Sequence, residues 1–144
     1  MRPLVDILDN EKYLFRLNEV TFERVNGEEE EDIELVVDDS FEISERQEDM
    51  FGVKLIRRVH FVPAAIFDIR VEFEVGRLVS EDAEEKLQEY DLEEIINSEN
   101  VDSITGYNFN RVSAIITSLT SSFEMSPLIT PPIFVKQSEV VGDK

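Results

Sequence analysis

The sequence contains no cysteine and no tryptophan, and it has a single histidine, His60. Without cysteine there are no disulfides, no thiolate nucleophiles and no thiolate metal sites. His60 falls inside a strand-like segment, and the five glycines are too scattered to form a phosphate-binding loop. We therefore expect a protein that is not an enzyme and that needs no cofactor and no metal.

Long apolar runs and basic residues are also scarce. No run approaches the roughly eighteen residues of a membrane span, and the N-terminus lacks the basic and then apolar layout of a secretory signal. The chain has 14 Lys and Arg against 33 Asp and Glu, a formal net charge of −19. Such a charge repels nucleic acid and anionic lipid, and it favours solubility and basic or unfolded partners. We expect a cytoplasmic protein that binds neither nucleic acid nor membrane.

Alternating apolar and polar residues predict four strands early in the chain. The predicted strands span residues 13–25, 33–43, 51–61 and 65–75. In the last of them apolar residues occupy every second position from Ala65 to Val75, and from Asp68 to Glu74 the positions between them are charged, with Asp68 and Arg70 among them. This pattern is typical of an antiparallel sheet with one buried and one solvated face. A change of phase in the first strand predicts a bulge near Asn18–Glu19.

Helix signals follow the strands, which is the order of an α+β fold. Ser80–Asp82 predicts the start of one helix, Asp91–Glu94 the start of a short second one, and the longest helix begins near Asn108. The predicted fold is a four-stranded antiparallel sheet followed by C-terminal helices. One long helix packs on the sheet and at an oligomer interface.

We expect a single domain over residues 1–144. Residues 1–10 would form an N-terminal extension, and residues 136–144 a polar C-terminal tail. The acidic run Glu28–Asp32 lacks the residue order of a calcium loop, so a charged, solvated loop is expected there.

The stretch from Val101 to Met125 is almost free of charge. Its apolar residues recur at steps of three and four, as on one side of a helix. The other positions carry small, uncharged side chains instead of the lysines and glutamates of a solvated face, which indicates that both sides are covered. Since one domain has one core, the second cover would be another copy of the chain. The predicted interface consists of Val112, Ser113, Ile116, Thr117, Thr120 and Ser121.

Aromatic residues near this helix suggest a second role. A sheet core should be complete without them, so they could line a groove that binds client polypeptides, although packing between copies is the slightly better explanation. The candidate groove residues are Tyr107, Phe109, Phe134 and Tyr90.

The closing stretch resembles that of the protein-export chaperone SecB family. Arg111–Thr120, then Phe123 and Pro127–Phe134, match a helix that begins near an arginine, runs through Ile-Thr-Ser and ends in a Leu-x-x-Pro segment with a final phenylalanine. Asn18–Glu23 and Ile33–Asp38 resemble the family's first two strands. The resemblance extends from about Leu17 to Val135.

This resemblance implies a four-stranded sheet with a long helix behind it, a dimer of dimers, and a chaperone that holds unfolded polypeptides without ATP. In the family, acids on the exposed sheet face meet the export motor SecA, and the matching acids here are Glu19, Glu23 and Asp68. Arg70 departs from the family's acidic pattern, and Gln137–Lys144 is too short and polar for the second packed helix and motor-binding tail. We therefore expect weak or no binding to SecA.

The hypotheses that follow belong to two classes. The first is an ATP-independent holdase for unfolded polypeptides, serving either export or one dedicated client such as an antitoxin. The second is an acidic, non-enzymatic adaptor that binds one folded partner. The sequence leaves open whether the homo-oligomer is a dimer or a dimer of dimers.

Overall fold

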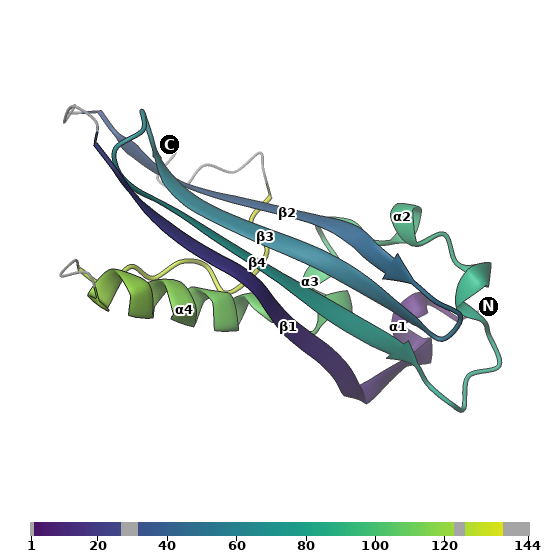
Figure 1. Cartoon of the computed structure of the whole chain (residues 1–144). Coiled ribbons are helices and arrows are strands. Elements are labelled where there is room, and N and C mark those ends of the chain that lie inside the picture. The colour runs from purple at the N-terminus through teal and green to yellow at the C-terminus, as the bar shows by residue number, and fades with distance from the viewer. Residues whose placement is uncertain (1, 27–31, 123–125, 137–144) are drawn as a thin grey trace.

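The computed structural model describes residues 2–26, 32–122 and 126–136. The elements are α1 (Leu4–Ile7), β1 (Leu8–Val25), β2 (Glu34–Arg46), β3 (Met50–Val62), β4 (Ile66–Val79), the 3-10 helix η1 (Leu87–Glu89), α2 (Leu92–Ile95), α3 (Val101–Thr105) and α4 (Phe109–Ser122). The strands form one antiparallel sheet in the order β1-β4-β3-β2. The helix α4 runs beneath the strands (Figure 1). The predicted fold class is confirmed.

The core lies between the sheet and the helices. On β4 the residues from Phe67 to Val75 alternate as the sequence predicts, with the apolar side chains buried against the helices and the charged ones facing away. Phe109 of α4 meets Phe73 of β4 edge to face, with ring centroids 5.2 Å apart. This geometry is favourable beyond the area that the rings bury.

The predicted bulge in β1 is present. Leu17 pairs with Phe73 and Glu19 with Glu72, so Asn18 is an extra residue in the ladder. The extra residue returns Val20 and Phe22 to the helix side of the sheet, which explains the change of phase in the sequence.

The helix predicted at Ser80–Asp82 is wrong. The backbone there forms turns and reaches only η1, where Leu87 is fully buried. Between Val79 and Leu87 the sole apolar residue is Ala83, so a helix would have had almost nothing to bury. The short helix predicted at Asp91–Glu94 is present as α2, although the Asp91 side chain makes no capping hydrogen bond.

Of the predicted N-terminal extension, residues 2–10 are part of the domain. Leu4, Ile7 and Leu8 are buried in the core, and the Ser80 N–H donates to the Ile7 carbonyl at 2.7 Å. The helix α1 is too short for its periodicity to be read from sequence. Most of the acidic run at 28–32, Phe123 and the tail from 137 onward lie outside the described residues.

The outer face of the sheet, which points away from the helices, is held together by polar side chains. Glu74 of β4 accepts hydrogen bonds from Asn18 at 2.9 Å, Arg16 at 2.6 Å and Ser44 at 2.8 Å. Ser44 reaches Glu74 across Gly52, where a Cβ would come within 3.0 Å of the Ser44 hydroxyl. Because Gly52 of β3 has no side chain, Ser44 of β2 can reach the same Glu74 carboxylate that Arg16 and Asn18 of β1 bind.

These three donors, led by Asn18, lower the pKa of Glu74 to about 2 from an ordinary value of 4.5. A carboxyl whose pKa is depressed by folding stabilises the folded state above its unfolded-state pKa, and this contribution is lost as the pH falls toward the folded-state value. We expect Glu74→Gln to reduce the loss of unfolding free energy between about pH 4.5 and about pH 2. Urea unfolding across this range measures it. Glu23→Gln, which alters an exposed carboxyl, should keep the wild-type profile, and equal profiles for all three proteins would contradict the assignment.

Candidate client-binding surface

The backbone after α4 returns along the helix as an extended segment, Pro127–Val135, which we call the closing segment. It is held against α4 by hydroxyl groups. Thr117 donates to the Leu128 carbonyl at 2.7 Å, Thr120 accepts from the Leu128 N–H at 2.8 Å, and Ser113 donates to the Thr130 carbonyl at 2.6 Å. The part of the small, uncharged side of α4 that carries Ser113, Thr117 and Thr120 is therefore covered by the same polypeptide, whereas Ser118 and Ser121 are exposed.

At the sheet the closing segment meets a buried ion pair. Arg57 of β3 and Asp39 of β2 are register partners on the helix side, both with 0% exposed side chains, joined at 2.8 and 2.6 Å. The Arg57 guanidinium also donates to the Thr130 hydroxyl at 3.1 Å, the Ile133 carbonyl at 2.8 Å and the Pro131 carbonyl. It lies 4.5 Å above the Phe109 ring.

Carboxylates hold the last residues of the closing segment. Asp39 accepts from the Val135 N–H at 2.7 Å, and Asp102 of α3 accepts from the Phe134 N–H at 2.9 Å. Burial raises the pKa of both carboxyls, against the hydrogen bonds from Arg57 and from these backbone N–H groups, which lower it. The backbone of the closing segment, which joins no strand ladder, is thus satisfied by side chains from four elements.

The structure separates the four predicted groove aromatics. Phe109, Phe134 and Tyr90 are buried in the core of the domain, and the Tyr90 hydroxyl donates to the Arg2 carbonyl at 2.6 Å. Tyr107 is 56% exposed. In this conformation only Tyr107 of the four presents surface to a partner.

The predicted oligomer residues are divided in the same way. Val112, Ser113, Ile116 and Thr120 are buried by the sheet and the closing segment, whereas Thr117 is half-buried and Ser121 is exposed. The cover that the sequence analysis assigned to a second copy is, for these four, supplied in cis. Oligomerisation itself stays a prediction.

The predicted acidic residues lie on the outer face, but two of them are paired. Glu19 accepts from Arg70 at 2.7 Å, and Asp68 accepts from Arg58 at 2.8 Å, which together with that arginine's other hydrogen bond lowers the pKa of Asp68. Glu23 is exposed and forms no ion pair within the described parts of the protein. Arg70, the departure from the family pattern, therefore neutralises one of the acids in question.

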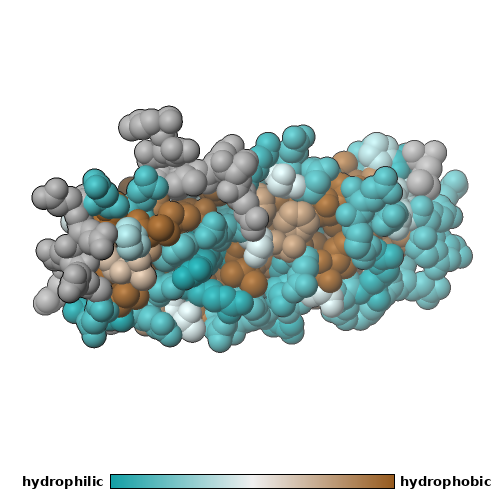
Figure 2. All heavy atoms as spheres, turned by 90° about the horizontal axis from the view of Figure 1, so that it is seen from above, coloured by the Kyte–Doolittle hydropathy of each residue, from teal (hydrophilic) through white to brown (hydrophobic). Residues whose placement is uncertain are grey.

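Sequence reasoning missed the most exposed apolar residues of the closing segment. Ile129 is 82% exposed and Ile133 is 51% exposed, on a backbone restrained by Pro127, Pro131 and Pro132. From above, hydrophobic side chains form several patches along the molecule, separated by hydrophilic ones (Figure 2). The signal in the sequence was the spacing of the prolines. Prolines fix an extended backbone, and a backbone of this kind cannot turn every aliphatic side chain toward the core.

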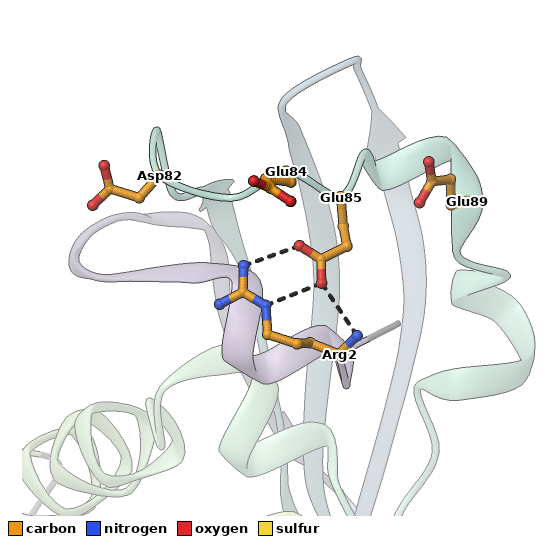
Figure 3. Close-up of a pocket in the computed structure, with 5 residues that line it drawn as sticks. All are labelled: Arg2, Asp82, Glu84, Glu85 and Glu89. Carbon is orange, nitrogen blue, oxygen red and sulfur yellow. Dashed lines mark hydrogen bonds and ion pairs between the residues drawn. The ribbon is translucent and has the colours of Figure 1, made fainter.

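A concave region near the N-terminus is charged. It is lined by Arg2, Asp82, Glu84, Glu85 and Glu89, and Arg2 donates to both oxygens of Glu85 (Figure 3). The Arg2 hydrogen bond is the main cause that lowers the pKa of Glu85 to about 2. The described residues that line it include no serine, threonine, cysteine or histidine.

Two further searches bear on the remaining function classes. Within the residues that the structure describes, no group of three or more His, Asp or Glu side chains could hold a metal ion. None of the helices in those residues is long and apolar enough to cross a membrane.

Comparison with solved structures identifies the fold as that of the SecB-like chaperones. The protein matches a SecB-like chaperone of Mycobacterium tuberculosis, solved with a ChAD peptide from the HigA1 antitoxin, with a TM-score of 0.52 and 13% identity, over 90% of its own length and 86% of the other's. It also matches a protein of unknown function from Streptococcus agalactiae, with a TM-score of 0.43 and 11% identity, over 83% of its own length and 97% of the other's. No family model and no curated protein matches the sequence.

Removal of the buried cation should make the protein unfold readily. In Arg57→Met the fully buried Asp39 carboxylate loses the one cation that pairs with it among the described residues, which costs about 3–5 kcal/mol. Arg58→Gln is the matched control, because it breaks an exposed pair on the same strand and should cost less than about 1 kcal/mol. Urea unfolding measures both, and equal losses would show that the buried pair has no special weight.

Proposed function

We propose that this protein is an ATP-independent molecular chaperone that holds unfolded or non-native polypeptides. The observation that supports this most directly is the exposure of Ile129 and Ile133 on a backbone fixed by hydrogen bonds. A fixed apolar surface can bury apolar client residues at roughly 25 cal/mol per Å² without first being ordered itself. The SecB-like fold agrees with this function.

The acidic composition supports the same proposal. A net charge of −19 keeps a complex with an apolar client soluble and draws basic, unfolded polypeptides toward the surface. We place this activity in the cytoplasm and in a homo-oligomer, a dimer or a dimer of dimers, in which the exposed Ser121 side of α4 would face another copy. Molar mass by light scattering tests the oligomer.

Within the chaperone class we favour one dedicated client over general export. The solved Mycobacterium tuberculosis chaperone was bound to an antitoxin peptide, so an antitoxin-like segment is the first client to test. The pairing of Glu19 and Asp68 with Arg70 and Arg58 leaves few free acids on the outer face to meet an export motor. An acidic adaptor that binds one folded partner is the alternative from another class.

Holdase activity should depend on the closing segment. We expect the double variant Ile129→Ser, Ile133→Ser to need several-fold more protein to suppress the aggregation of unrelated unfolded proteins, followed by light scattering. Its melting temperature should hardly change, because both side chains are exposed. Val62→Ser, which alters an exposed aliphatic residue at the far end of β3, is the control and should keep full activity. Full protection by the double variant would remove the closing segment from the client surface, and no protection by the wild type would favour the adaptor.

The export motor SecA should bind weakly or not at all. Exposed ion pairs contribute less than about 1 kcal/mol each, so paired acids offer a second protein little, and that little is sensitive to salt. Calorimetry at physiological salt measures the affinity. Arg58→Gln with Arg70→Gln, which frees Asp68 and Glu19, should strengthen any binding. Tight wild-type binding that Glu19→Lys and Glu23→Lys abolish would instead establish an export chaperone.

A further inference from the structure

Most arginines of this acidic protein are paired with carboxylates, but two that lie close together are not. Ion pairs engage Arg2, Arg16, Arg46, Arg57, Arg58 and Arg70. Within the described residues, Arg77 of β4 and Arg111 of α4 form no ion pair, and neither does Arg24, which lies elsewhere on β1. In a protein with 33 acidic residues, two neighbouring arginines without an ion pair are unexpected.

Arg77 is the buried member of the two. It is the register partner of Tyr13, so the two side chains are neighbours on the helix side of the sheet. Arg77 is 6% exposed, and it donates to the Asp9 carbonyl at 3.2 Å and to the Ile104 carbonyl. Its Nε is buried without a hydrogen-bond partner. The Asp9 carboxylate forms no ion pair with Arg77 in the described residues and acts on it through its charge alone, and its Oδ1 accepts the N–H groups of Glu11 and Lys12 at 2.9 and 3.1 Å.

Arg111 is the exposed member of the two. Its guanidinium is 4.8 Å from the centre of the Phe15 ring, and one N–H points to the Tyr13 hydroxyl at a long 3.5 Å. Within the described residues its guanidinium makes no other hydrogen bond, so most of its donors stay available. The N-terminal end of α4, which lies beside β1, adds the partial positive charge of the helix dipole (Figure 1).

The turn between α3 and α4 contributes an exposed aromatic ring, that of Tyr107. Gly106 and Tyr107 both have left-handed backbone, with φ of 79° and 59°. For a bulky residue such as Tyr107 this conformation is strained, and strain of this kind is concentrated at functional sites. Gly106 lies over Tyr13, since a Cβ there would be 4.0 Å from the Tyr13 Cζ. Tyr107, the next residue along the backbone from Gly106, is 56% exposed beside this contact.

We propose that Arg111, Tyr13 and Tyr107, with Arg77 beneath them, form a site for one carboxylate of a bound polypeptide. The forked guanidinium and the hydroxyl suit the two oxygens of a carboxylate, which comes either from an Asp or Glu residue or from the last residue of the polypeptide. The Tyr107 ring covers the residue beside it. A polyanion such as a nucleic acid is disfavoured by the net charge of −19. The proposal rests on the proposed function and makes it selective: a neutral or basic client that carries one acidic anchor.

Three fluorescent peptides built from Leu, Phe, Ser and Gly test the site by anisotropy at physiological salt. One has a central Glu and an amidated end, the second has Gln there and an amidated end, and the third has Gln and a free C-terminal carboxylate. We expect the second peptide, which has no carboxylate, to bind roughly tenfold more weakly than the carboxylate peptide that the site accepts. Whether that is the first or the third peptide identifies the source of the carboxylate. Arg111→Gln should remove this difference.

Arg24→Gln is the matched control, because it removes the same charge from a residue that also forms no ion pair, and it should keep the tenfold preference. If Arg111→Gln were to lose its circular dichroism spectrum, Tyr13→Phe, which keeps the ring, takes its place and should reduce the preference. Equal binding of all three peptides by the wild type, or equal losses in Arg111→Gln and Arg24→Gln, would overturn the site. When the wild type still suppresses aggregation, only the site is wrong. When no peptide binds and no protein is protected, the chaperone function fails with it.

Discussion

The buried pair of Arg57 and Asp39 is the interaction on which the rest of the structure depends. Two charges out of water are costly unless each is paired and hydrogen-bonded, and here both are. Their remaining hydrogen-bonding capacity is directed at the backbone of the closing segment, whose carbonyl and N–H groups have no strand to pair with. The pair thus fixes where the backbone runs after α4. It also decides which aliphatic side chains stay outside.

This arrangement changes how the long helix is understood. Small hydroxyl side chains on its second side allow a neighbouring backbone to approach closely, and the neighbour is the closing segment. Because those hydroxyls hold backbone atoms, they are needed whether or not a second copy is present. The surface available to a partner moves outward, to Ile129, Ile133, Tyr107 and Ser121.

The sheet was predictable because its signals are local. The alternation of β4 and the change of phase at Asn18 each lie within a few neighbouring residues, and both are present in the structure. The closing-segment contacts were not predictable in this way, because Arg57 and Thr130 are 73 residues apart. One signal was available: Arg57 stands in phase with Leu55 and Val59, on the buried side of its strand. A charge at such a position requires a buried partner, although its identity cannot be deduced from the pattern.

The distribution of charge links the fold to the choice of partner. Arginines on the outer face are neutralised by neighbouring acids, and Arg57 is neutralised inside the core. Their fields therefore cancel at short range, and the long-range field is that of a strongly acidic protein. Long-range attraction of basic clients follows from the whole composition and has little specificity. A short-range preference requires cations without local partners, and the corner of Arg77 and Arg111 provides them. Attraction and selection would then act at different distances on the same client.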